Sequence, residues 1–420
     1  MIHSFVVHYS EVALKGKNRP EFVRALRRNL VAALRGLAPE ITLQEGRFFL
    51  QADGDPDEVA LRLARVFGVA WFAEVARVPS DYEKIREAVI RIASNSKGSS
   101  FKIDPRRSDK SYPMDSQELA VKLGSEVVSN TGKRVDLSHP DLSIRVDVIK
   151  GHALVYSEKF SGPGGLPVGT AGRVMHLFSG GIDSPVAAWL LMKRGCSPVY
   201  VHFYLAPTSE YVMESKVIRL IKKLSAYGGK ITMVLVPFAD YQLATFGVPA
   251  ELEPSLFRRF MRMTAEALAP SFGASGVSTG DSLSQAASQT LWNLGAFDEG
   301  AALPILRPLL SYDKEEIVSL ARRIGTYELS LEEYKDCCAI ISRHPRTRTR
   351  AAAISDYARE LRFSALVWES IGRGTLVTYN PSGEATKTSP LAETIRSAMA
   401  RQSRDRLSNN SPVVNPESKI

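Results

Sequence analysis

The sequence has little of what disulfide-rich, membrane and secreted proteins require. Among 420 residues there are only three cysteines, Cys196, Cys337 and Cys338, too few for a disulfide framework in so long a chain. No apolar run approaches the roughly 18 residues that a membrane-spanning helix needs. The first residues, MIHSFVVHYSE, lack the basic and long apolar stretches of a secretory signal. We therefore expect a soluble protein in the reducing cytoplasm.

Low-complexity segments and internal repeats are also absent. Hydrophobic residues make up 44% of the chain and charged residues 24%, which is an ordinary globular composition. This composition excludes global disorder and collagen-like structure. At roughly 150 residues per domain, the length indicates two to three domains.

Basic residues exceed acidic ones by 54 to 45, giving a net charge of +9, and they are clustered. The first cluster contains Lys15, Lys17, Arg19, Arg24, Arg27, Arg28 and Arg35; the second contains Arg106, Arg107 and Lys110; the third contains Arg343, His344, Arg346, Arg348 and Arg350. Together the clusters could follow a phosphate backbone. Each one alone is equally typical of a solvated helix face or loop.

The first part of the chain is predicted to be α+β. Residues 1–54 indicate a strand, a helix with a basic face and further strands over 40–51. Residues 55–160 form a second unit, with helices expected over 56–67, 81–94 and 116–129 and strands over 100–103, 142–148 and 152–158. Residues 161–171 contain SGPGGLPVGT, whose glycines and prolines indicate a linker.

Residues 172–395 change to an alternation of strands and helices. Strands are expected at 173–178, 198–204, 231–236 and 275–279, and helices at 184–194, 209–226 and 255–269. This order predicts βαβ units and a parallel sheet. The polar residues 396–420 are expected to be a disordered tail.

The most informative string is LFSGGIDS, in which an apolar strand leads directly into a helix. Gly180 and Gly181 allow the backbone to approach an anion, and the Ser179 and Ser184 hydroxyls can donate to phosphate oxygens. The positive end of the following helix points to the same place. A bare Ser-Gly-Gly could be an ordinary turn, but the whole hexapeptide between a strand and a helix predicts a phosphate-binding loop.

This loop resembles the PP-loop of ATP pyrophosphatases, which pass an adenylate to a carbonyl oxygen. Further motifs are similar to those of the tRNA 4-thiouridine synthetase family, in that family's order over about residues 5–350. They are Tyr9–Arg19, Ser100–Ile103 with Arg106, Arg107, Asp109 and Lys110, Gly164–Gly169, Val201–Phe203, Arg258–Arg262, Thr279–Leu283, Ala287–Leu291, Leu306–Leu309 and Asp313–Ile317. The resemblance implies a ferredoxin-like unit, an RNA-binding THUMP domain and a parallel-sheet PP-loop domain.

The same resemblance implies the site residues. ATP would be bound by Leu177, Phe178, Ser179, Gly180, Gly181, Asp183, Ser184, His202, Phe203, Arg258, Gly280 and Gln289. Catalysis would involve Asp183, which would also bind Mg²⁺, together with Lys314, Cys338 and Cys337. RNA would be bound by Lys15, Lys17, Arg19, Arg24, Arg28, Arg106, Arg107 and Lys110. The plainer alternatives are core residues for Leu177, Phe178 and Phe203, a surface ion pair for Arg258, and an ordinary strand position for His176.

Cys337 and Cys338 precede the third basic cluster. A cysteine persulfide can deliver sulfur to an activated carbon, and neighbouring Arg343 and Arg346 would favour the thiolate. The family's spacing favours Cys338 as the sulfur carrier, Cys337 stays open, and two buried apolar cysteines remain the alternative. Cys196 is expected to be structural.

Two departures from some relatives limit the prediction. Residues after about 390 have neither the length nor a cysteine for a rhodanese domain, so a thiamine-thiazole role is not expected. No Cys-x-x-Cys pair is present for an iron–sulfur cluster. The sulfur donor stays open between a cysteine desulfurase, a separate carrier and sulfide.

We therefore predict an ATP-dependent tRNA sulfurtransferase. By resemblance it adenylates O4 of the uridine at position 8, replaces that oxygen by sulfur to form 4-thiouridine, and acts as a homodimer. The alternatives are a tRNA-binding protein with an inactive pyrophosphatase domain and an AMP-forming ligase acting on another substrate.

Overall fold

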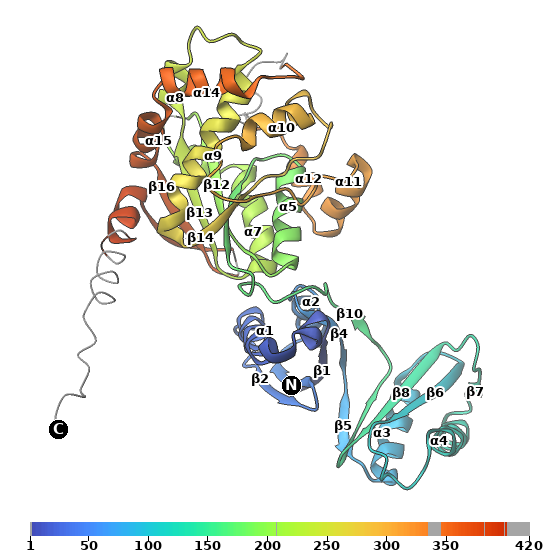
Figure 1. Cartoon of the computed structure of the whole chain (residues 1–420). Coiled ribbons are helices and arrows are strands. Elements are labelled where there is room, and N and C mark those ends of the chain that lie inside the picture. Colours follow the sequence, from blue (N-terminus) through green and yellow to red (C-terminus); the bar gives the residue numbers. More distant parts are fainter. Residues whose placement is uncertain (1, 207, 335–345, 382, 399, 401–420) are drawn as a thin grey trace, which may run out of the picture. The chain divides into compact units, whose positions relative to one another are not determined.

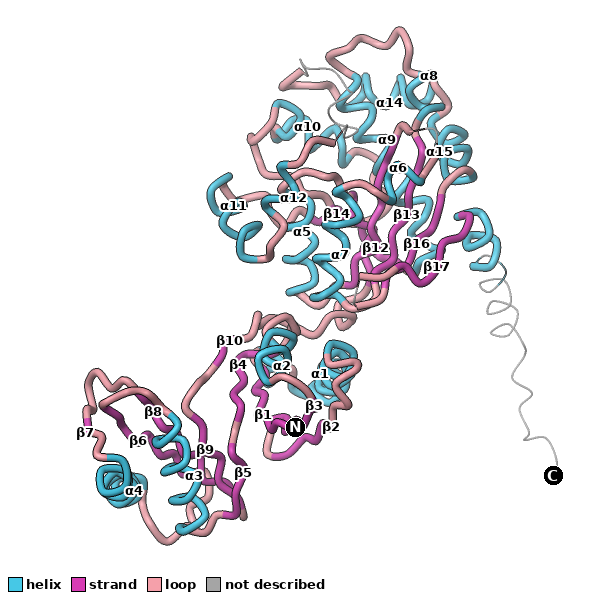
Figure 2. The backbone as a smooth tube through the Cα atoms, turned by 180° about the vertical axis from the view of Figure 1, so that it is seen from behind, coloured by secondary structure: helices cyan, strands magenta, loops and turns pink. Residues whose placement is uncertain are grey.

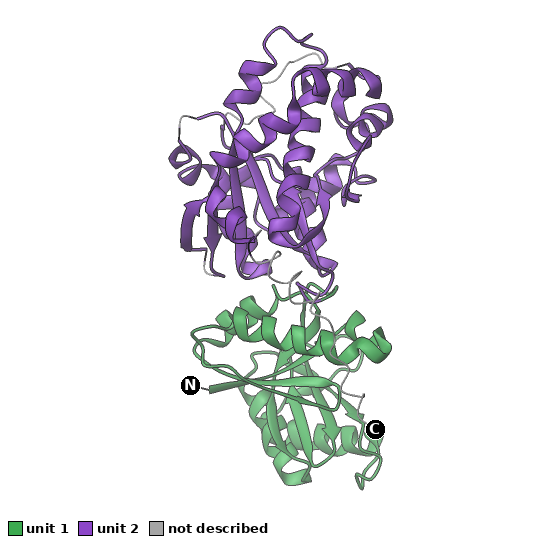
Figure 3. Ribbon diagram, turned by 60° about the vertical axis from the view of Figure 1, so that its left-hand side comes forward, with its two compact units in different colours: residues 1–166 green, residues 167–420 purple. Residues whose placement is uncertain are grey.

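The computed structural model describes residues 2–206, 208–334, 346–381, 383–398 and 400. The chain divides into two compact units, Met1–Leu166 and Pro167–Ile420 (Figure 3). No helix in the described part of the chain is long and apolar enough to cross a membrane. Most of the expected tail, residues 396–420, lies outside the described residues, as do Cys337 and Cys338.

The first sheet of the N-terminal unit has the strand order β10-β4-β1-β3-β2. Its strands are β1 (Ile2–Tyr9), β2 (Glu40–Gln44), β3 (Arg47–Asp53), β4 (Val69–Glu74) and β10 (Phe160–Ser161), and its helices are α1 (Arg19–Ala33) and α2 (Pro56–Leu63). Leu26 and Leu30 of α1 and Val59 and Leu63 of α2 are buried in one core with Phe72 of β4. Residues 56–74, which the sequence analysis grouped with the second unit, therefore complete the core of the first sheet.

The second sheet of this unit has the order β5-β9-β8-β6-β7. Its strands are β5 (Ala76–Pro79), β6 (Ser100–Arg107), β7 (Arg134–Val135), β8 (Leu142–Ile149) and β9 (His152–Tyr156), and α3 (Tyr82–Asn95) and α4 (Ser116–Thr131) pack against it. Helix α4 begins at the capping box of Asp115 and Glu118 and ends at Gly132, whose φ is 68°. The two helices expected over 81–94 and 116–129 are confirmed.

The C-terminal unit contains a seven-stranded sheet of order β15-β14-β11-β12-β13-β16-β17 (Figure 2). Its strands are β11 (Arg173–Leu177), β12 (Ser197–Tyr204), β13 (Ile231–Pro237), β14 (Ala274–Ser278), β15 (Ile305–Leu306), β16 (Thr375–Tyr379) and β17 (Ala385–Pro390). Strands β11 to β15 pair in parallel, whereas β16 and β17 pair antiparallel at one edge. The predicted parallel sheet is confirmed.

Helices cover both faces of this sheet (Figure 1). The helices of this unit include α5 (Asp183–Lys193), α6 (Glu210–Met213), α7 (Lys216–Gly228), α8 (Ala239–Ala244), α9 (Glu253–Phe272), α10 (Leu291–Asp298), α11 (Lys314–Arg323), α12 (Tyr327–Leu331), α14 (Ala351–Glu360) and α15 (Phe363–Gly372). The expectation of one helix over 209–226 is wrong. The Ser215 hydroxyl accepts a hydrogen bond from the Val217 amide and starts α7 as a separate helix.

The strand order places a switch point beside β11. The chain continues from β11 to β12 and β13 on one side, and then returns to pair β14 with the other side of β11. In open parallel sheets, ligands bind beyond the carboxyl ends of the strands at such a point. The segments that follow β11 and β14 therefore meet where a site is expected.

Candidate active site

The loop between β11 and α5 is closed by its two serines. The Ser179 amide donates to the Ser184 Oγ at 3.1 Å, and the Ser184 hydroxyl donates to the Ser179 carbonyl at 2.8 Å. Helix α5 begins at Asp183 and has no side-chain cap on its first amides. Uncapped N–H groups at a helix start can bind an anion, so the loop has the geometry of a phosphate site.

His176 fixes the position of this loop, although the sequence analysis treated it as an ordinary strand residue. Its fully buried ring places Nε2 2.9 Å from the Ser184 carbonyl and Nδ1 3.2 Å from the Ser278 hydroxyl. Burial lowers its pKa to about 4, so the ring is neutral at physiological pH. Because a carbonyl only accepts, Nε2 carries the proton and Nδ1 accepts from Ser278. Nothing in the sequence pattern signalled these contacts.

Gly280 lies directly against the start of α5. A Cβ at Gly280 would lie 3.0 Å from the Ser184 amide nitrogen and 3.1 Å from the Asp183 carbonyl carbon. Both atoms belong to the backbone and cannot rotate away. The resemblance assigned Gly280 to ATP binding, and the structure shows why a side chain there would displace the phosphate loop.

We expect Gly280→Ala to lower kcat/KM for ATP by roughly ten- to a hundredfold, because sub-ångström shifts of a positioned loop are costly. Gly295→Ala in α10 is the matched control, since no heavy atom lies within 4 Å of its added Cβ. Steady-state kinetics with varied ATP, together with thermal unfolding, would test this. Equal ATP kinetics for the two variants would show that the close approach at Gly280 is unimportant.

The structure brings the two predicted polar catalytic residues together across a long stretch of sequence. Lys314 Nζ donates to Asp183 Oδ1 at 2.9 Å, and Gln285 Nε2 donates to Asp183 Oδ2 at 3.0 Å. Lys314 is the first residue of α11 and lies within the capping box that Asp313 and Glu316 form. The Asp183 carboxylate is therefore held beside the phosphate loop between a cation and an amide. Gln285 was not anticipated.

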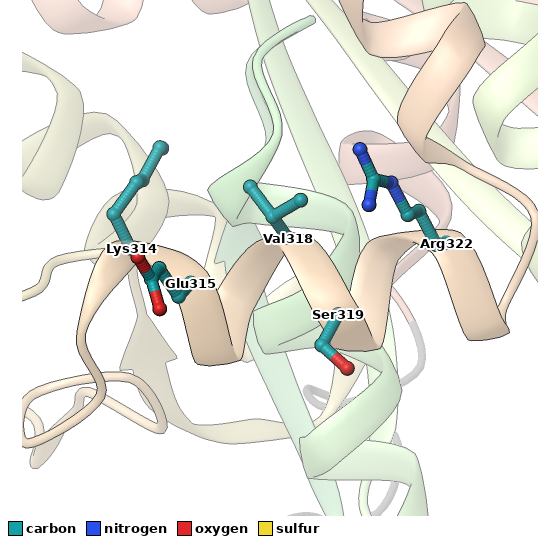
Figure 4. Close-up of a pocket in the computed structure, with 5 residues that line it drawn as sticks. All are labelled: Lys314, Glu315, Val318, Ser319 and Arg322. Atoms are coloured by element: carbon teal, nitrogen blue, oxygen red, sulfur yellow. The ribbon is translucent and has the colours of Figure 1, made fainter.

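Lys314 also lines a surface depression along α11, together with Glu315, Val318, Ser319 and Arg322. Figure 4 shows Lys314, Val318 and Arg322 on the same side of the helix, as their spacing requires. None of the phosphate-loop residues lines this depression. Lys314 therefore contacts Asp183 beside the phosphate loop and also lies on an exposed surface of α11.

The predicted residues at the ends of β11 and β12 are mostly buried in the C-terminal unit. The side chains of Phe178 and Phe203 are buried, and Phe203 packs edge-on against the aromatic rings of α9. His202 is completely buried; its Nδ1 lies 2.9 Å from the Phe178 carbonyl and its Nε2 lies 3.0 Å from the Tyr334 hydroxyl. Leu177 is partly buried against the same core as Phe203.

The chain just before the predicted cysteines is anchored beside the loop. Lys216 Nζ donates to the Ser330 carbonyl at 2.8 Å and to the Glu332 carbonyl at 2.6 Å. Its Cε and the Tyr334 ring are the nearest neighbours of a Cβ placed on Gly180, at 2.9 and 3.3 Å. Tyr334 is therefore fixed against both His202 and the phosphate loop. Lys216 and Tyr334 were not anticipated.

Arg258 takes part in an ion pair with a buried carboxylate. Its two terminal nitrogens donate to Asp281 at 2.8 and 2.7 Å, and the Arg307 Nε lies 3.3 Å from Asp281 Oδ2. Burial would raise the Asp281 pKa, but Arg258, the Thr279 hydroxyl and Arg307 together lower it to about 2. Asp281 directly follows Gly280, so this network holds the segment that contacts the phosphate loop. The Gln289 side chain belongs to the same segment, with Oε1 3.4 Å from the Ser282 amide.

The predicted RNA-binding residues lie on the N-terminal unit. Arg24 and Arg28 are exposed on α1, opposite buried Leu26 and Leu30. Arg107 instead donates to the Tyr112 and Met114 carbonyls, both at 3.0 Å, and holds the loop before α4. The remaining predicted residues lie around η1 (Glu11–Leu14) and η2 (Gly16–Asn18) or at the end of β6, and are Lys15, Lys17, Arg19, Arg106 and Lys110.

Fold and loop together define a PP-loop α/β unit joined to an N-terminal unit of two α+β sheets. Three family models match the chain: the ThiI ferredoxin-like domain over residues 4–73, the THUMP domain over 79–158, and Thiamine biosynthesis protein (ThiI) over 169–363. The predicted three-part architecture is confirmed.

Relatives match nearly the whole chain. The probable tRNA sulfurtransferase of Moorella thermoacetica is 39% identical, over 91% of this chain and 100% of its own. That of Thermus thermophilus is 38% identical, over 91% of this chain and 95% of its own. The chain belongs to the tRNA sulfurtransferase family.

Solved structures similar to this chain agree with the family membership. A 4-thiouridine synthetase–RNA complex with bound ATP has a TM-score of 0.82 and 31% identity, covering 90% of this chain and all of that one. PH1313 from Pyrococcus horikoshii has a TM-score of 0.59 and 26% identity, covering 77% of this chain and 99% of that one.

Proposed function

We propose that this protein uses ATP to transfer sulfur to tRNA, forming 4-thiouridine at position 8. The observation that carries the proposal is the meeting of a phosphate loop with the Asp183–Lys314 pair at the switch point of the sheet. Its relatives named tRNA sulfurtransferase, and the ATP- and RNA-bound 4-thiouridine synthetase of similar fold, support the same reaction.

In this proposal the phosphate loop binds the ATP phosphates through the first amides of α5 and the Ser179 and Ser184 hydroxyls. The uridine O4 attacks the α-phosphorus, and pyrophosphate leaves. Lys314, beside Asp183, stabilises the negative charge that develops on the phosphates. Three residues act on the phosphate loop indirectly, through the segment that packs against it: Gly280, Arg258 and Gln289. Four residues at the ends of β11 and β12 lie beside the loop: Leu177, Phe178, His202 and Phe203.

Asp183 fits a magnesium ion that is held mainly by substrate. No cluster of three or more metal-binding side chains exists among the described residues. Mg²⁺ commonly uses one or two carboxylates together with phosphate oxygens and water, so one carboxylate at a phosphate loop is a suitable donor set. When bound, Mg²⁺ would neutralise charge on the α- and β-phosphates. Asp183 would hold it there in place of its present partners, Lys314 and Gln285.

Sulfur delivery is assigned to Cys338, with Cys337 as its resolving partner. The terminal sulfur of a Cys338 persulfide attacks C4, and AMP leaves. The Cys337 thiolate then attacks Cys338, which releases 4-thiouridine and forms a disulfide that an external thiol reduces. The two cysteines follow Tyr334 by three and four residues. Because a residue adds at most about 3.6 Å to a chain, the step from the anchored Tyr334 to Cys338 spans at most about 14 Å.

The finer assignments follow the resemblance to the family. We assign residues 172–395 to the chemistry, residues 161–171 to a linker, and the tRNA contacts to the N-terminal unit. The direct sulfur donor is a cysteine desulfurase, a persulfide carrier or sulfide. The protein acts in the cytoplasm as a homodimer.

The role of the N-terminal basic face can be tested with Arg24→Gln combined with Arg28→Gln. Each lost phosphate contact removes roughly one unit of salt slope, so we expect a slope lower by about one to two units and weaker binding of every tRNA alike. Measured affinities for two different tRNAs at several salt concentrations would show this. An unchanged slope would mean that this face of α1 is only solvated surface.

Nucleoside analysis of tRNA tests the function itself. Cells without the gene should lack 4-thiouridine, and expression of the full chain should restore it at position 8. Purified protein with ATP, a sulfur donor and an unmodified tRNA transcript should form the same nucleoside together with AMP and pyrophosphate. Unchanged 4-thiouridine in the deletion strain would reject the proposal.

A further inference from the structure

Of the third basic cluster, Arg343 and His344 lie outside the described residues, whereas Arg346, Arg348 and Arg350 lie on a segment that is held against α10. Within residues 346–350 the Thr349 side chain is buried, whereas Arg346, Arg348 and Arg350 are exposed. The segment therefore packs through Thr349, and we refer to its three exposed arginines, Arg346, Arg348 and Arg350, as the row.

Asn293 of α10 holds this row in place. Its buried amide donates to the Arg346 carbonyl at 2.7 Å and to the Ala287 carbonyl at 2.8 Å, and its oxygen accepts from the Thr349 amide at 2.9 Å. The Thr290 hydroxyl adds a bond to the Thr347 carbonyl at 2.6 Å. A fully satisfied buried amide of this kind fixes two segments together. The row and α10 thus form one rigid element.

Two large apolar side chains stand beside the row in solvent. Leu291 is 74% exposed and Trp292 is 59% exposed, and the Arg348 guanidinium lies 4.0 Å from the centre of the Trp292 ring. Arg346 is paired with Glu251 at 2.8 Å. Neither Arg348 nor Arg350 has a carboxylate partner within the part of the chain that the structure describes. An exposed indole beside a guanidinium group that has no carboxylate partner among these residues is suited to a base next to a phosphate.

This patch is connected to the nucleotide loop through one short segment. The segment that carries Gly280 against α5 continues to Gln285, which donates to Asp183 at 3.0 Å. It is then folded by the bond from the Ser284 amide to the Gln289 carbonyl at 3.1 Å, and leads directly into Trp292. A base that reacts inside an enzyme must leave the helical stack, and a substitute stacking surface lowers that cost.

We propose that Trp292, Arg348 and Arg350 form an RNA-binding patch on the catalytic unit. Trp292 stacks on a base neighbouring the uridine that reacts, and Arg348 and Arg350 bind the flanking phosphates. The assignment of that base rests on the proposed function. RNA is favoured over a protein partner because Arg348 and Arg350, near the exposed ring, have no carboxylate partner among the described residues.

The test measures binding of an unmodified tRNA transcript to the full chain. Base–aromatic stacking in single-stranded nucleic acid predicts that Trp292→Ala weakens binding by roughly tenfold, while Trp292→Phe retains most of the affinity. Removing both arginines, as Arg348→Gln with Arg350→Gln, should lower the salt slope by about one to two units. ATP binding should stay unchanged in all three variants.

Two exposed side chains of the same unit provide matched controls. Trp368 is 48% exposed on α15, and the side chain of Arg359 is 79% exposed on α14. Trp368→Ala and Arg359→Gln should leave tRNA affinity within about twofold, because each lacks the indole–guanidinium arrangement. If they weaken binding as much as the patch variants do, a specific patch is rejected.

Two other outcomes would also overturn the proposal. Unchanged tRNA affinity of Trp292→Ala would exclude stacking. Normal tRNA affinity combined with loss of thiolation from a protein persulfide donor, but not from sulfide, would assign the patch to that protein instead. Failure of the wild-type chain to make 4-thiouridine would reject the proposed function. The tRNA-binding measurements would still test the patch.

Discussion

Replacing Asp183 by alanine is expected to lower the rate of ATP-dependent tRNA adenylation by about 10²- to 10³-fold, the effect typical of losing a preorganised charged group at a reacting centre. The carboxylate accepts from Lys314 at 2.9 Å and from Gln285 at 3.0 Å, beside the loop that is to hold the phosphates. Alanine releases both partners and removes the proposed Mg²⁺ ligand. Binding of tRNA should change little, because the N-terminal basic residues are untouched.

The measurement is pyrophosphate release and tRNA affinity on the same preparation. Asp240→Ala is a matched control, because Asp240 also pairs with a basic side chain, Arg373, at 2.9 Å, but lies on α8 outside the loop. Its adenylation rate should be close to that of wild type. Substantial adenylation by Asp183→Ala would refute its role with phosphate and metal.

Replacing Cys338 by serine is expected to abolish thiolation from a persulfide donor while adenylation continues. Serine keeps the size of the side chain but cannot carry a persulfide. Cys337→Ser should stop within the first turnover, with the tRNA linked to Cys338 through a disulfide, since Cys337 is assigned to break that bond and release 4-thiouridine. If the family's sulfur-carrying cysteine corresponds to Cys337 and not to Cys338, the two variants exchange their phenotypes.

Cys196 supplies the control for these variants. It is buried beside α5, and burial raises the pKa of its thiol, so it is a poor nucleophile. Cys196→Ala should therefore thiolate tRNA at a normal rate. Sulfide added in place of the persulfide donor should restore thiolation in Cys338→Ser if that cysteine only carries sulfur. Normal thiolation by the double variant with the physiological donor would disprove covalent relay.

Local signals in the chain were sufficient for most of the architecture. Apolar strands of five to eight residues followed by helices predicted the parallel sheet, since that alternation has few other packed solutions. The outer strands at the two ends of the sheet, β15 on one side and β16 and β17 on the other, were not predicted. Two of them are antiparallel additions after α15, and β15 has only two residues. Whether such a strand forms depends on the neighbouring strand with which it pairs. Its own residues show almost no sequence pattern that would predict it.

The sequence by itself determined the phosphate loop, because Ser-Gly-Gly-Ile-Asp-Ser contains both the hydroxyls and the conformational freedom that the site needs. It also determined the family and, through the glycine-rich segment, where the two compact units separate. Only the tertiary structure decided what surrounds that loop. His176, Lys216, Gln285 and Tyr334 act through contacts between residues distant in sequence, and the strand order at the switch point, not any local motif, brings them together.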